Sequence, residues 1–339
     1  MTLNSSTSPP KGPESLPDAH PLLVYGLAWA TLSAFLFSSK VILAKWVYAS
    51  HPISPIHLLV LRMGSVLPLY IGVAIWSCVR SGRFITIKEA GALVVLGACG
   101  YHVSSFLDFC GMRYISAGLE RMVLYLFPGF VLLLNAWEHK KPIKMGFLPS
   151  FLLCYVGIYL MYKNDLGNAG KHTVWGISLV ALAALVYSFF VVYGKKYIDK
   201  LGHWKFTSLA MLSATLGLFI QYWASTEKAT EVLFHIPREV LFGAVLMGIF
   251  CTFIPSFLSN ISLYILGPER MSLMGTVGPI ATLLLGTYIL KEKMTVWQWS
   301  GVGLILIGTL SFQLNWRAYI NKMRPLKIPL QSRQAVKSD

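Results

Sequence analysis

The chain has 339 residues, of which 13% are charged and 55% are hydrophobic, and its mean hydropathy is +0.60. Soluble proteins carry about 25% charged residues, so the composition excludes an ordinary soluble protein and indicates an all-α integral membrane protein. The net charge of +15 is explained by basic residues that set membrane orientation, and we expect no nucleic acid partner. The five cysteines show no CxxC spacing and no nearby histidine pairs, so we expect no metal and no cofactor.

Apolar runs of about 20 residues, each long enough to cross a bilayer as a helix, recur along the whole chain. Residues 1–20 are polar and rich in Ser and Pro, which predicts a disordered cytosolic N-tail. The ten predicted spans are 22–46, 54–78, 88–112, 116–137, 145–162, 174–196, 204–225, 238–265, 270–290 and 294–316. Residues 317–339 form a basic C-tail.

The sequence repeats itself at a shift of 150 to 151 residues, because SFL at Ser105–Leu107 recurs at Ser256–Leu258. Other matched pairs are Gly26/Gly176, Ser38/Ser188, Lys45/Lys195, Pro128/Pro279, Lys140/Lys291 and Gly157/Gly308. The pattern predicts two repeats of five spans, residues 22–162 and 174–316. Since five is odd, the second repeat would enter the membrane inverted, a common construction of secondary transporters.

The basic residues predict the orientation of the chain. With the N-terminus inside, the inner segments hold 18 Lys and Arg residues and the outer segments hold 8. By the positive-inside rule, both termini are therefore expected to be cytosolic.

Ionisable residues inside the predicted spans are concentrated in the first repeat. They are Lys40, Arg62, His102, Asp108, Glu120 and Arg121. Charges within a membrane are costly and commonly face a cavity or the bundle interior. Without the histidine, the set holds three positive and two negative charges, which predicts a polar network that binds an anionic group of a substrate, or groups that couple transport to an ion.

The second repeat has uncharged residues at the positions aligned with these charges. Phe190, Leu212, Ser259, Met271 and Ser272 replace them. Structural explanations stay open beside the functional one. Lys40 could extend to the membrane surface, Glu120 could favour its helix start through the helix dipole, Arg62 could form a closed ion pair with Asp108 or Glu120, and His102 could be a hydrogen-bonded core residue.

Prolines and aromatic residues add two further predictions. Pro128, Pro255 and Pro279 are candidates for helix bends, since proline removes a backbone donor. The aromatic residues Tyr101, Tyr125, Phe127, Trp175 and Tyr187 could line a pocket. We interpret the pairs Gly111/Ser262 and Gly157/Gly308 as sites of close helix packing.

Several segments resemble a known family. GYHVSSFLDFCGMRYISAGLERMVLYLFPGFVLLL (Gly100–Leu134) resembles the third and fourth helices of EamA-type transporters of the drug/metabolite transporter (DMT) superfamily, and FSSKVILAKWVY (Phe37–Tyr48) resembles the first-helix pattern of one bacterial branch. LRM (Leu61–Met63) is similar to the arginine motif of the second helix, and Met271–Gly308 resembles the closing pattern of the repeat. The chain departs from the family at Gly278, where an acidic residue often precedes the proline.

The resemblance implies a ten-helix duplicated fold that exports small metabolites, often amino acids, across a bacterial inner membrane. We therefore expect a secondary transporter of a carboxylate-bearing metabolite, with membrane lipid, a small-molecule substrate, protons as the candidate coupling ion and a second copy in a homodimer as its partners. Efflux of lipophilic cations is the alternative cargo. A membrane-embedded enzyme and a non-transporting structural partner are the alternatives of another class, and neither HExxH nor a P-loop motif occurs.

Overall fold

The computed structural model describes residues 19–140, 148–167, 171–226, 236–275, 277–290 and 295–320, and these residues form helices without a strand. The predicted N-tail falls outside them up to residue 18, as does the C-tail from residue 321. The C-tail begins later than predicted, since the last helix continues to Ile320.

The helices of the first half correspond to the first five predicted spans. They are α1 (Ala19–Ser50), α2 (Pro55–Ser81), α3 (Ile87–Gly97) with η1 (Ala98–Val103) and α4 (Ser104–Gly111), α5 (Ala117–Leu124) with α6 (Phe127–Glu138), and α7 (Leu148–Gly167).

The helices of the second half correspond to the other five spans. They are α8 (Lys171–Leu201), α9 (His203–Ser225), α11 (Arg238–Gly248) with η3 (Ile249–Phe253) and α12 (Ile254–Leu266), α13 (Pro268–Met274) with α14 (Val277–Leu290), and α15 (Val296–Ile320). Among the described residues, seven helices are long and apolar enough to span a membrane, and Leu148–Leu160 and Val296–Gly308 form shorter apolar helices.

Local sequence signals explain where the helices begin and end. Ser54 caps α2 by accepting a hydrogen bond from the His57 N–H, and Pro55 occupies the first turn, where its missing N–H costs nothing. Gly82 ends α2 in the left-handed conformation, with φ of 56°. The next helix, α3, starts with a capping box between Thr86 and Glu89.

Two wide turns interrupt the third and eighth spans at equivalent places. The π-helical segments η1 and η3 begin at Ala98 and Ile249, which are 151 residues apart. A third and a fourth interruption lie at Tyr125–Leu126, between α5 and α6, and at Gly275, between α13 and α14. These positions correspond to within one residue under the repeat shift of 151, so the irregular parts of the two halves lie at matching places.

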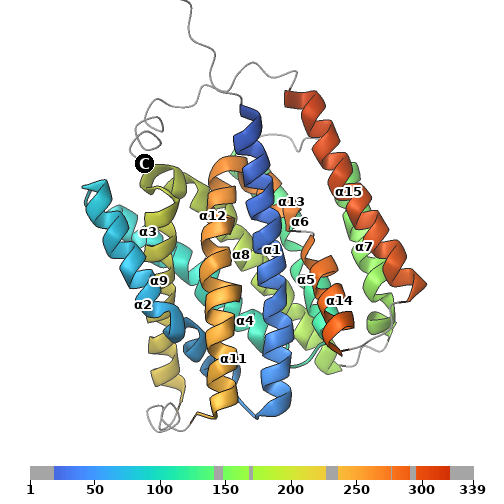
Figure 1. The fold of residues 1–339 in the computed structure, drawn as a ribbon, viewed down its shortest axis with the longest axis horizontal. Helices are drawn as coiled ribbons and strands as arrows, with labels where there is room; N and C mark the ends of the chain where they lie inside the picture. Colours follow the sequence, from blue (N-terminus) through green and yellow to red (C-terminus); the bar gives the residue numbers. More distant parts are fainter. Residues whose placement is uncertain are drawn as a thin grey trace, which may run out of the picture.

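The two halves pack on each other in reciprocal pairs. Helix α1 of the first half packs against α12 and α14 of the second, and α8 of the second half packs against α4 and α6 of the first. Likewise, α2 packs on α11, and α9 packs on α3. Helices α7 and α15 pair with each other at one side of the bundle (Figure 1). This exchange of partners supports the predicted duplication. The inverted orientation of the two repeats stays a prediction.

Glycines allow the closest helix contacts, as the sequence predicts. A Cβ atom on Gly157 would lie 2.7 Å from the carbonyl oxygen of Gly301, and a Cβ atom on Gly308 would lie 2.9 Å from that of Ser150. Both contacts join α7 to α15, so the two glycines bring these helices together.

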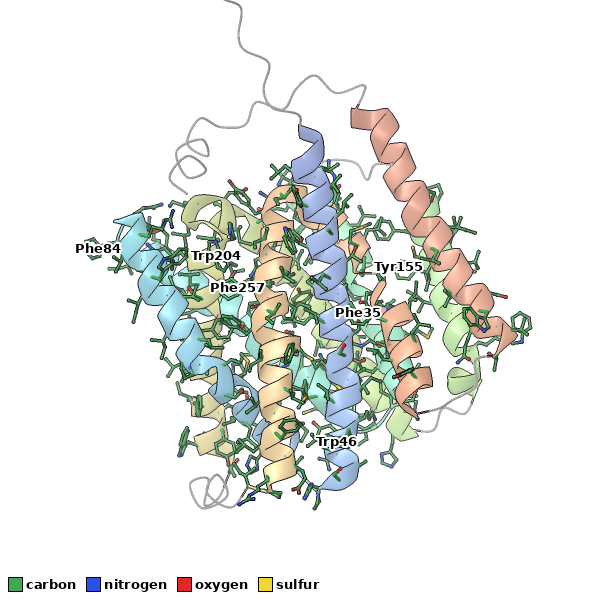
Figure 2. All side chains as sticks on the ribbon, in the orientation of Figure 1. Phe35, Trp46, Phe84, Tyr155, Trp204 and Phe257 are labelled. Atoms are coloured by element: carbon green, nitrogen blue, oxygen red, sulfur yellow. The ribbon has the colours of Figure 1, made fainter. Side chains whose placement is uncertain are left out.

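Apolar side chains cover the outside of the bundle. Figure 2 shows Phe84 and Trp46 near opposite ends, and both are exposed. Trp204 is also exposed, and its ring packs on that of the buried Phe257 with the centroids 4.9 Å apart. An apolar exterior is what a bilayer requires of an integral membrane protein.

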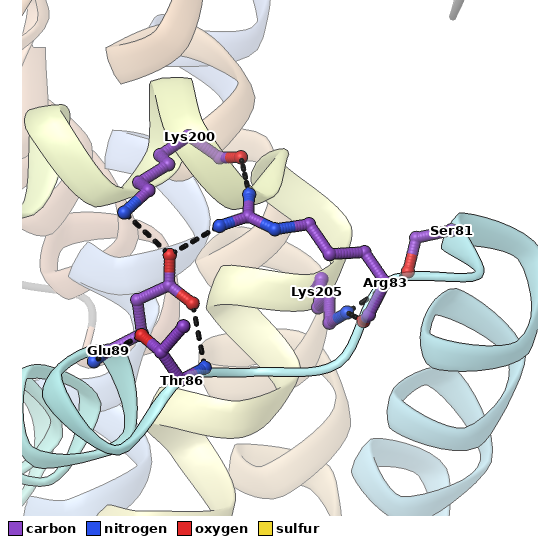
Figure 3. Close-up of polar contacts among 6 residues, drawn as sticks. All are labelled: Ser81, Arg83, Thr86, Glu89, Lys200 and Lys205. Carbon is purple, nitrogen blue, oxygen red and sulfur yellow. Dashed lines mark hydrogen bonds and ion pairs between the residues drawn. The ribbon is translucent and has the colours of Figure 1, made fainter.

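A charged cluster joins the two halves at one end of the bundle (Figure 3). Glu89 Oε1 accepts hydrogen-bonded ion pairs from Arg83 Nη2 at 2.6 Å and from Lys200 Nζ at 2.8 Å. Lys205 Nζ donates to the hydroxyl of Ser81 at 3.0 Å and to the carbonyl oxygen of Arg83 at 2.5 Å. These residues lie at the ends of α2, α8 and α9 and at the start of α3, so the cluster fixes those helix ends together.

Candidate functional site

A cavity of about 130 Å³ lies between the two halves. It is lined by residues of α1, α2, η1, α4, α5 and α6 of the first half and of α8, α9, η3, α12 and α13 of the second. Four of its lining residues are charged, namely Lys40, Arg62, Asp108 and Arg121. All four come from the first half, and all four belong to the cluster that the sequence predicts.

Lys40 of α1 and Asp108 of α4 form a buried ion pair through Lys40 Nζ and Asp108 Oδ2. Only 8% of Lys40 and 2% of Asp108 are exposed. Lys40 therefore does not extend to the membrane surface, as one structural explanation supposed. The second carboxylate oxygen, Asp108 Oδ1, is buried and has no hydrogen-bond partner.

Glu120 and Arg121 of α5 form a second buried pair. Arg121 Nε donates to Glu120 Oε2 and Arg121 Nη2 donates to Glu120 Oε1, both at 2.5 Å. Ser116, and not Glu120, provides the side-chain cap of α5 by accepting from the Leu119 N–H. The Glu120 carboxylate is thus held by its neighbour, and Arg121 is left facing the cavity with its charge compensated.

Arg62 of α2 differs from the other charged residues of the site. It is 3% exposed, and its guanidinium makes no hydrogen bond and no ion pair with any residue that the structure describes. Its Cζ lies 4.9 Å from the centroid of the Phe109 ring, and Lys40 Nζ lies 5.4 Å from the same centroid. A closed structural ion pair of Arg62 with Asp108 or Glu120 is therefore not formed.

His102 lies apart from the cavity, although the sequence places it in the same set. Its Nε2 is 2.6 Å from Gln221 Oε1 of α9, and a Cβ atom on Gly217 would lie 2.9 Å from its Nδ1. The ring thus packs against α9 and does not line the cavity. This arrangement matches the alternative reading of His102 as a hydrogen-bonded core residue.

The predicted helix bends coincide with irregular backbone. The break at Tyr125–Leu126 directly precedes Pro128, and the interruption at Gly275 directly precedes the helix that contains Pro279. Pro255 follows the wide turn η3. Proline cannot donate a backbone hydrogen bond, which explains why the helices restart at these residues.

Four of the five aromatic residues that the sequence predicts to line a pocket do so. Tyr101, Tyr125, Phe127 and Tyr187 line the cavity, whereas Trp175 is 57% exposed on α8. The four rings are connected through Phe190, because Tyr125 packs on Phe127, Phe127 on Tyr187, Tyr187 on Phe190 and Phe190 on Tyr101, with centroids 4.8 to 5.8 Å apart.

Two residues at the site could not be found by a search for charged residues. Ser259 of α12 lines the cavity, and its buried Oγ has no hydrogen-bond partner. Its alignment with Asp108 is the signal that could have identified it. Phe109, whose ring lies close to both Lys40 and Arg62, carries no such signal, since its contacts depend on the packing of α1, α2 and α4.

Space explains why the chain has Gly278 where the resemblance leads us to expect an acidic residue. A Cβ atom at this position would overlap the hydroxyl of Tyr125 and lie 2.5 Å from Tyr125 Cζ. The glycine does not have a positive φ, so it is required by the close approach of Tyr125 and not by the backbone conformation.

Chemically, the site combines charged and aromatic side chains around one cavity. The structure brings three cationic and two anionic side chains together. Among the described residues, no group of three or more His, Cys, Asp or Glu side chains could hold a metal ion.

Comparison with known proteins agrees with this architecture. Residues 174–312, which lie within the predicted second repeat, match the EamA-like transporter family. An uncharacterized transporter of Archaeoglobus fulgidus is 26% identical over 264 residues, which cover 77% of this chain and 89% of that protein. The uncharacterized transporter YcbK of Bacillus subtilis is 23% identical over 286 residues, covering 82% and 89%.

A solved crystal structure shares the fold. It superposes with a TM-score of 0.68 at 16% identity and covers 88% of this chain and 99% of that chain. The helical bundle, the family match and these relatives together agree with the resemblance noted in the sequence: the chain is a multi-pass membrane protein whose residues 174–312 match the EamA-like transporter family, and it is similar over most of its length to proteins named as transporters.

Proposed function

We propose that this protein is a secondary transporter of a small metabolite that carries a carboxylate, such as an amino acid, and that Arg62 binds the carboxylate. The observation that carries the proposal is the unpaired, buried guanidinium of Arg62 on the cavity wall. A buried charge without a partner is expensive, so an anion from outside the protein would relieve that cost.

The chemistry of the guanidinium favours a carboxylate. Its planar fork of N–H donors matches the two oxygens of a carboxylate and forms paired, charge-assisted hydrogen bonds. The Phe109 ring supports the guanidinium from one side, which holds the fork in place while leaving its donors for the ligand.

Two further polar atoms suit the amino group of such a substrate. Asp108 Oδ1 and Ser259 Oγ are buried without partners on the same cavity. An ammonium donates three hydrogen bonds, which a carboxylate oxygen and a hydroxyl oxygen can accept. A cavity of about 130 Å³ also suits a metabolite, since an apolar cavity of about 150 Å³ holds a benzene molecule.

The duplication supports alternating access, because two related halves can exchange roles around a central site. The positive-inside count supports cytosolic termini, and the resemblance supports outward transport across a bacterial inner membrane. Protons as the coupling ion and a homodimer complete the proposal.

Efflux of lipophilic cations is the second candidate, because aromatic rings line the cavity. Tyr101, Tyr125, Phe127 and Tyr187 could surround a cation. In this case Asp108 or Glu120, and not Arg62, would provide the charged contact.

The test is ligand-induced thermal stabilisation of the purified protein. Wild type, Arg62→Ala and the exposed control Arg113→Ala would be screened against amino acids, monocarboxylates, nucleobases and lipophilic cations, since a ligand that binds the folded state raises its Tm. We expect carboxylate-bearing ligands to stabilise wild type and Arg113→Ala but not Arg62→Ala.

Stabilisation by lipophilic cations alone would overturn the carboxylate assignment and favour drug efflux. Any ligand that shifts the Tm would then be used in counterflow assays on liposomes. Binding without flux would contradict transport and favour the non-transporting alternative.

A further inference from the structure

The two interrupted spans meet at the cavity, and their side chains interlock there. Tyr125 and Phe127 lie at the break between α5 and α6, whereas Gly275 and Gly278 lie at the equivalent break between α13 and α14. A Cβ atom on Gly275 would lie 2.9 Å from Phe127 Cζ, and one on Gly278 would overlap the Tyr125 hydroxyl. Aromatic rings of one half thus occupy notches that glycines leave in the other.

At one pair of equivalent positions, the first half has a large side chain and the second half has none. Phe127 and Gly278 correspond under the shift of 151 residues. Each is next to an equivalent serine, since Ser188 Oγ donates to the Phe127 carbonyl oxygen at 3.2 Å and Ser38 Oγ lies 2.6 Å from where a Gly278 Cβ atom would be. The backbone is therefore similar in the two halves, but the space beside it holds the Phe127 ring in one half and no side chain of Gly278 in the other.

Tyr125 has little freedom to move except into the cavity. Only 4% of it is exposed. Its ring packs on Phe127, with centroids 5.8 Å apart, and its hydroxyl end lies beside Ser38 of α1 and Gly278 of α14. Tyr125 also lines the cavity.

We propose that Tyr125, seated in the notch at Gly278, determines the largest substrate that the cavity accepts. The inference rests on the proposed function and assigns to that same site the residue that selects the body of the substrate, while Arg62 binds its carboxylate. Shortening Tyr125 enlarges the cavity. Filling the notch at Gly278 displaces Tyr125 toward the cavity and makes it smaller.

The first experiment tests the contact without any ligand, through a double-mutant cycle in Tm. The cycle combines Tyr125→Leu with Gly278→Ala in a Ser38→Ala background, because Ser38 Oγ would also crowd the new methyl group. We expect Gly278→Ala to lower the Tm when Tyr125 is present. With Leu at position 125 the same change should be neutral or stabilising, since alanine favours helix more than glycine does. Equal effects in both backgrounds would overturn the proposed contact.

The second experiment tests selectivity with a graded series of amino acids from glycine and alanine to phenylalanine and tryptophan. Wild type, Tyr125→Phe, Tyr125→Leu and Gly278→Ala would be compared by ligand-dependent thermal shift. Tyr125→Phe should keep the wild-type size limit, Tyr125→Leu should accept larger ligands, and Gly278→Ala should accept only smaller ones. Affinities near the limit should change about tenfold or more, because one methylene that a pocket cannot hold costs about 10- to 200-fold.

The outcomes separate this inference from the proposed function. If Arg62→Ala abolishes binding while the size limit is the same in all Tyr125 and Gly278 variants, Tyr125 is not the selecting residue and the carboxylate site stands. If no member of the series binds to wild type or to Tyr125→Leu, both proposals are wrong.

Discussion

The two walls of the cavity come from matching helices but have different chemistry. The first half contributes Lys40, Arg62, Asp108 and Arg121, whereas the second half contributes uncharged residues such as Tyr187, Ser259 and Met271. Ser259 and Met271 align with Asp108 and Glu120. On the duplication that the sequence predicts, the comparison teaches that two copies of one scaffold can form a polarised site when only one copy carries charge, and such a site can orient a ligand that has a charged head and a neutral body.

Breaking the Lys40–Asp108 pair should have the largest effect. Asp108→Asn leaves the Lys40 ammonium buried without its partner, and loss of one member of a buried pair costs about 3–5 kcal/mol. The free energy of unfolding in detergent would be measured for Asp108→Asn, Lys40→Met and the double variant. We expect the double variant to be more stable than Asp108→Asn, and strictly additive effects would contradict a coupled pair.

Adding a charge to the second wall should have an intermediate effect. Met271→Glu introduces a carboxylate at the position equivalent to Glu120, which brings the formal charge of the cluster from +1 to zero. For a separation of about 8–16 Å and an effective dielectric constant near 20, Coulomb's law gives an opposition to anion binding of about 1–2 kcal/mol. Titration of a carboxylate-bearing ligand should show about tenfold weaker binding, and Met271→Gln is the neutral control. Unchanged affinity would show that net charge does not govern this site.

Disrupting the charged cluster at the helix ends should have the smallest effect. Glu89→Ala removes the capping box of α3 and the ion pairs with Arg83 and Lys200. We expect a loss of about 1–2 kcal/mol in stability, because a cap is worth about 1 kcal/mol and ion pairs whose cationic side chains are about half-exposed add little. Glu89→Gln can keep the capping box and separates the two contributions. Ligand affinity should not change, since Glu89 lies outside the cavity.

The ten spans and the charged residues could be predicted from sequence because both produce local signals. An ionisable residue inside an apolar run, such as Arg62, is conspicuous wherever it lies in the fold. Its partners are not, since Lys40 and Asp108 are 68 positions apart and their pairing depends on how α1 meets α4. For the same reason the sequence places His102 in the cluster, although its ring contacts Gln221 in the structure.

The breaks in the helices also differ in whether the local sequence indicates them. Pro128 and Pro279 indicate that spans 4 and 9 are irregular, because proline leaves a local mark in the sequence. The turn η3 is followed by Pro255, whereas no proline marks η1. The contact between Tyr125 and Gly278 likewise needs both halves to be folded before it can be recognised.

The paired wide turns η1 and η3 bear on how the protein evolved. On the duplication that the sequence predicts, η1 and η3 lie at corresponding sites, and a feature that both copies share is most simply inherited from a single ancestral unit. The charges occur in one copy only. The backbone irregularity would then be the older feature, and the difference between the walls would have arisen after the gene was copied, so ancestral units could have assembled as identical pairs before one copy specialised.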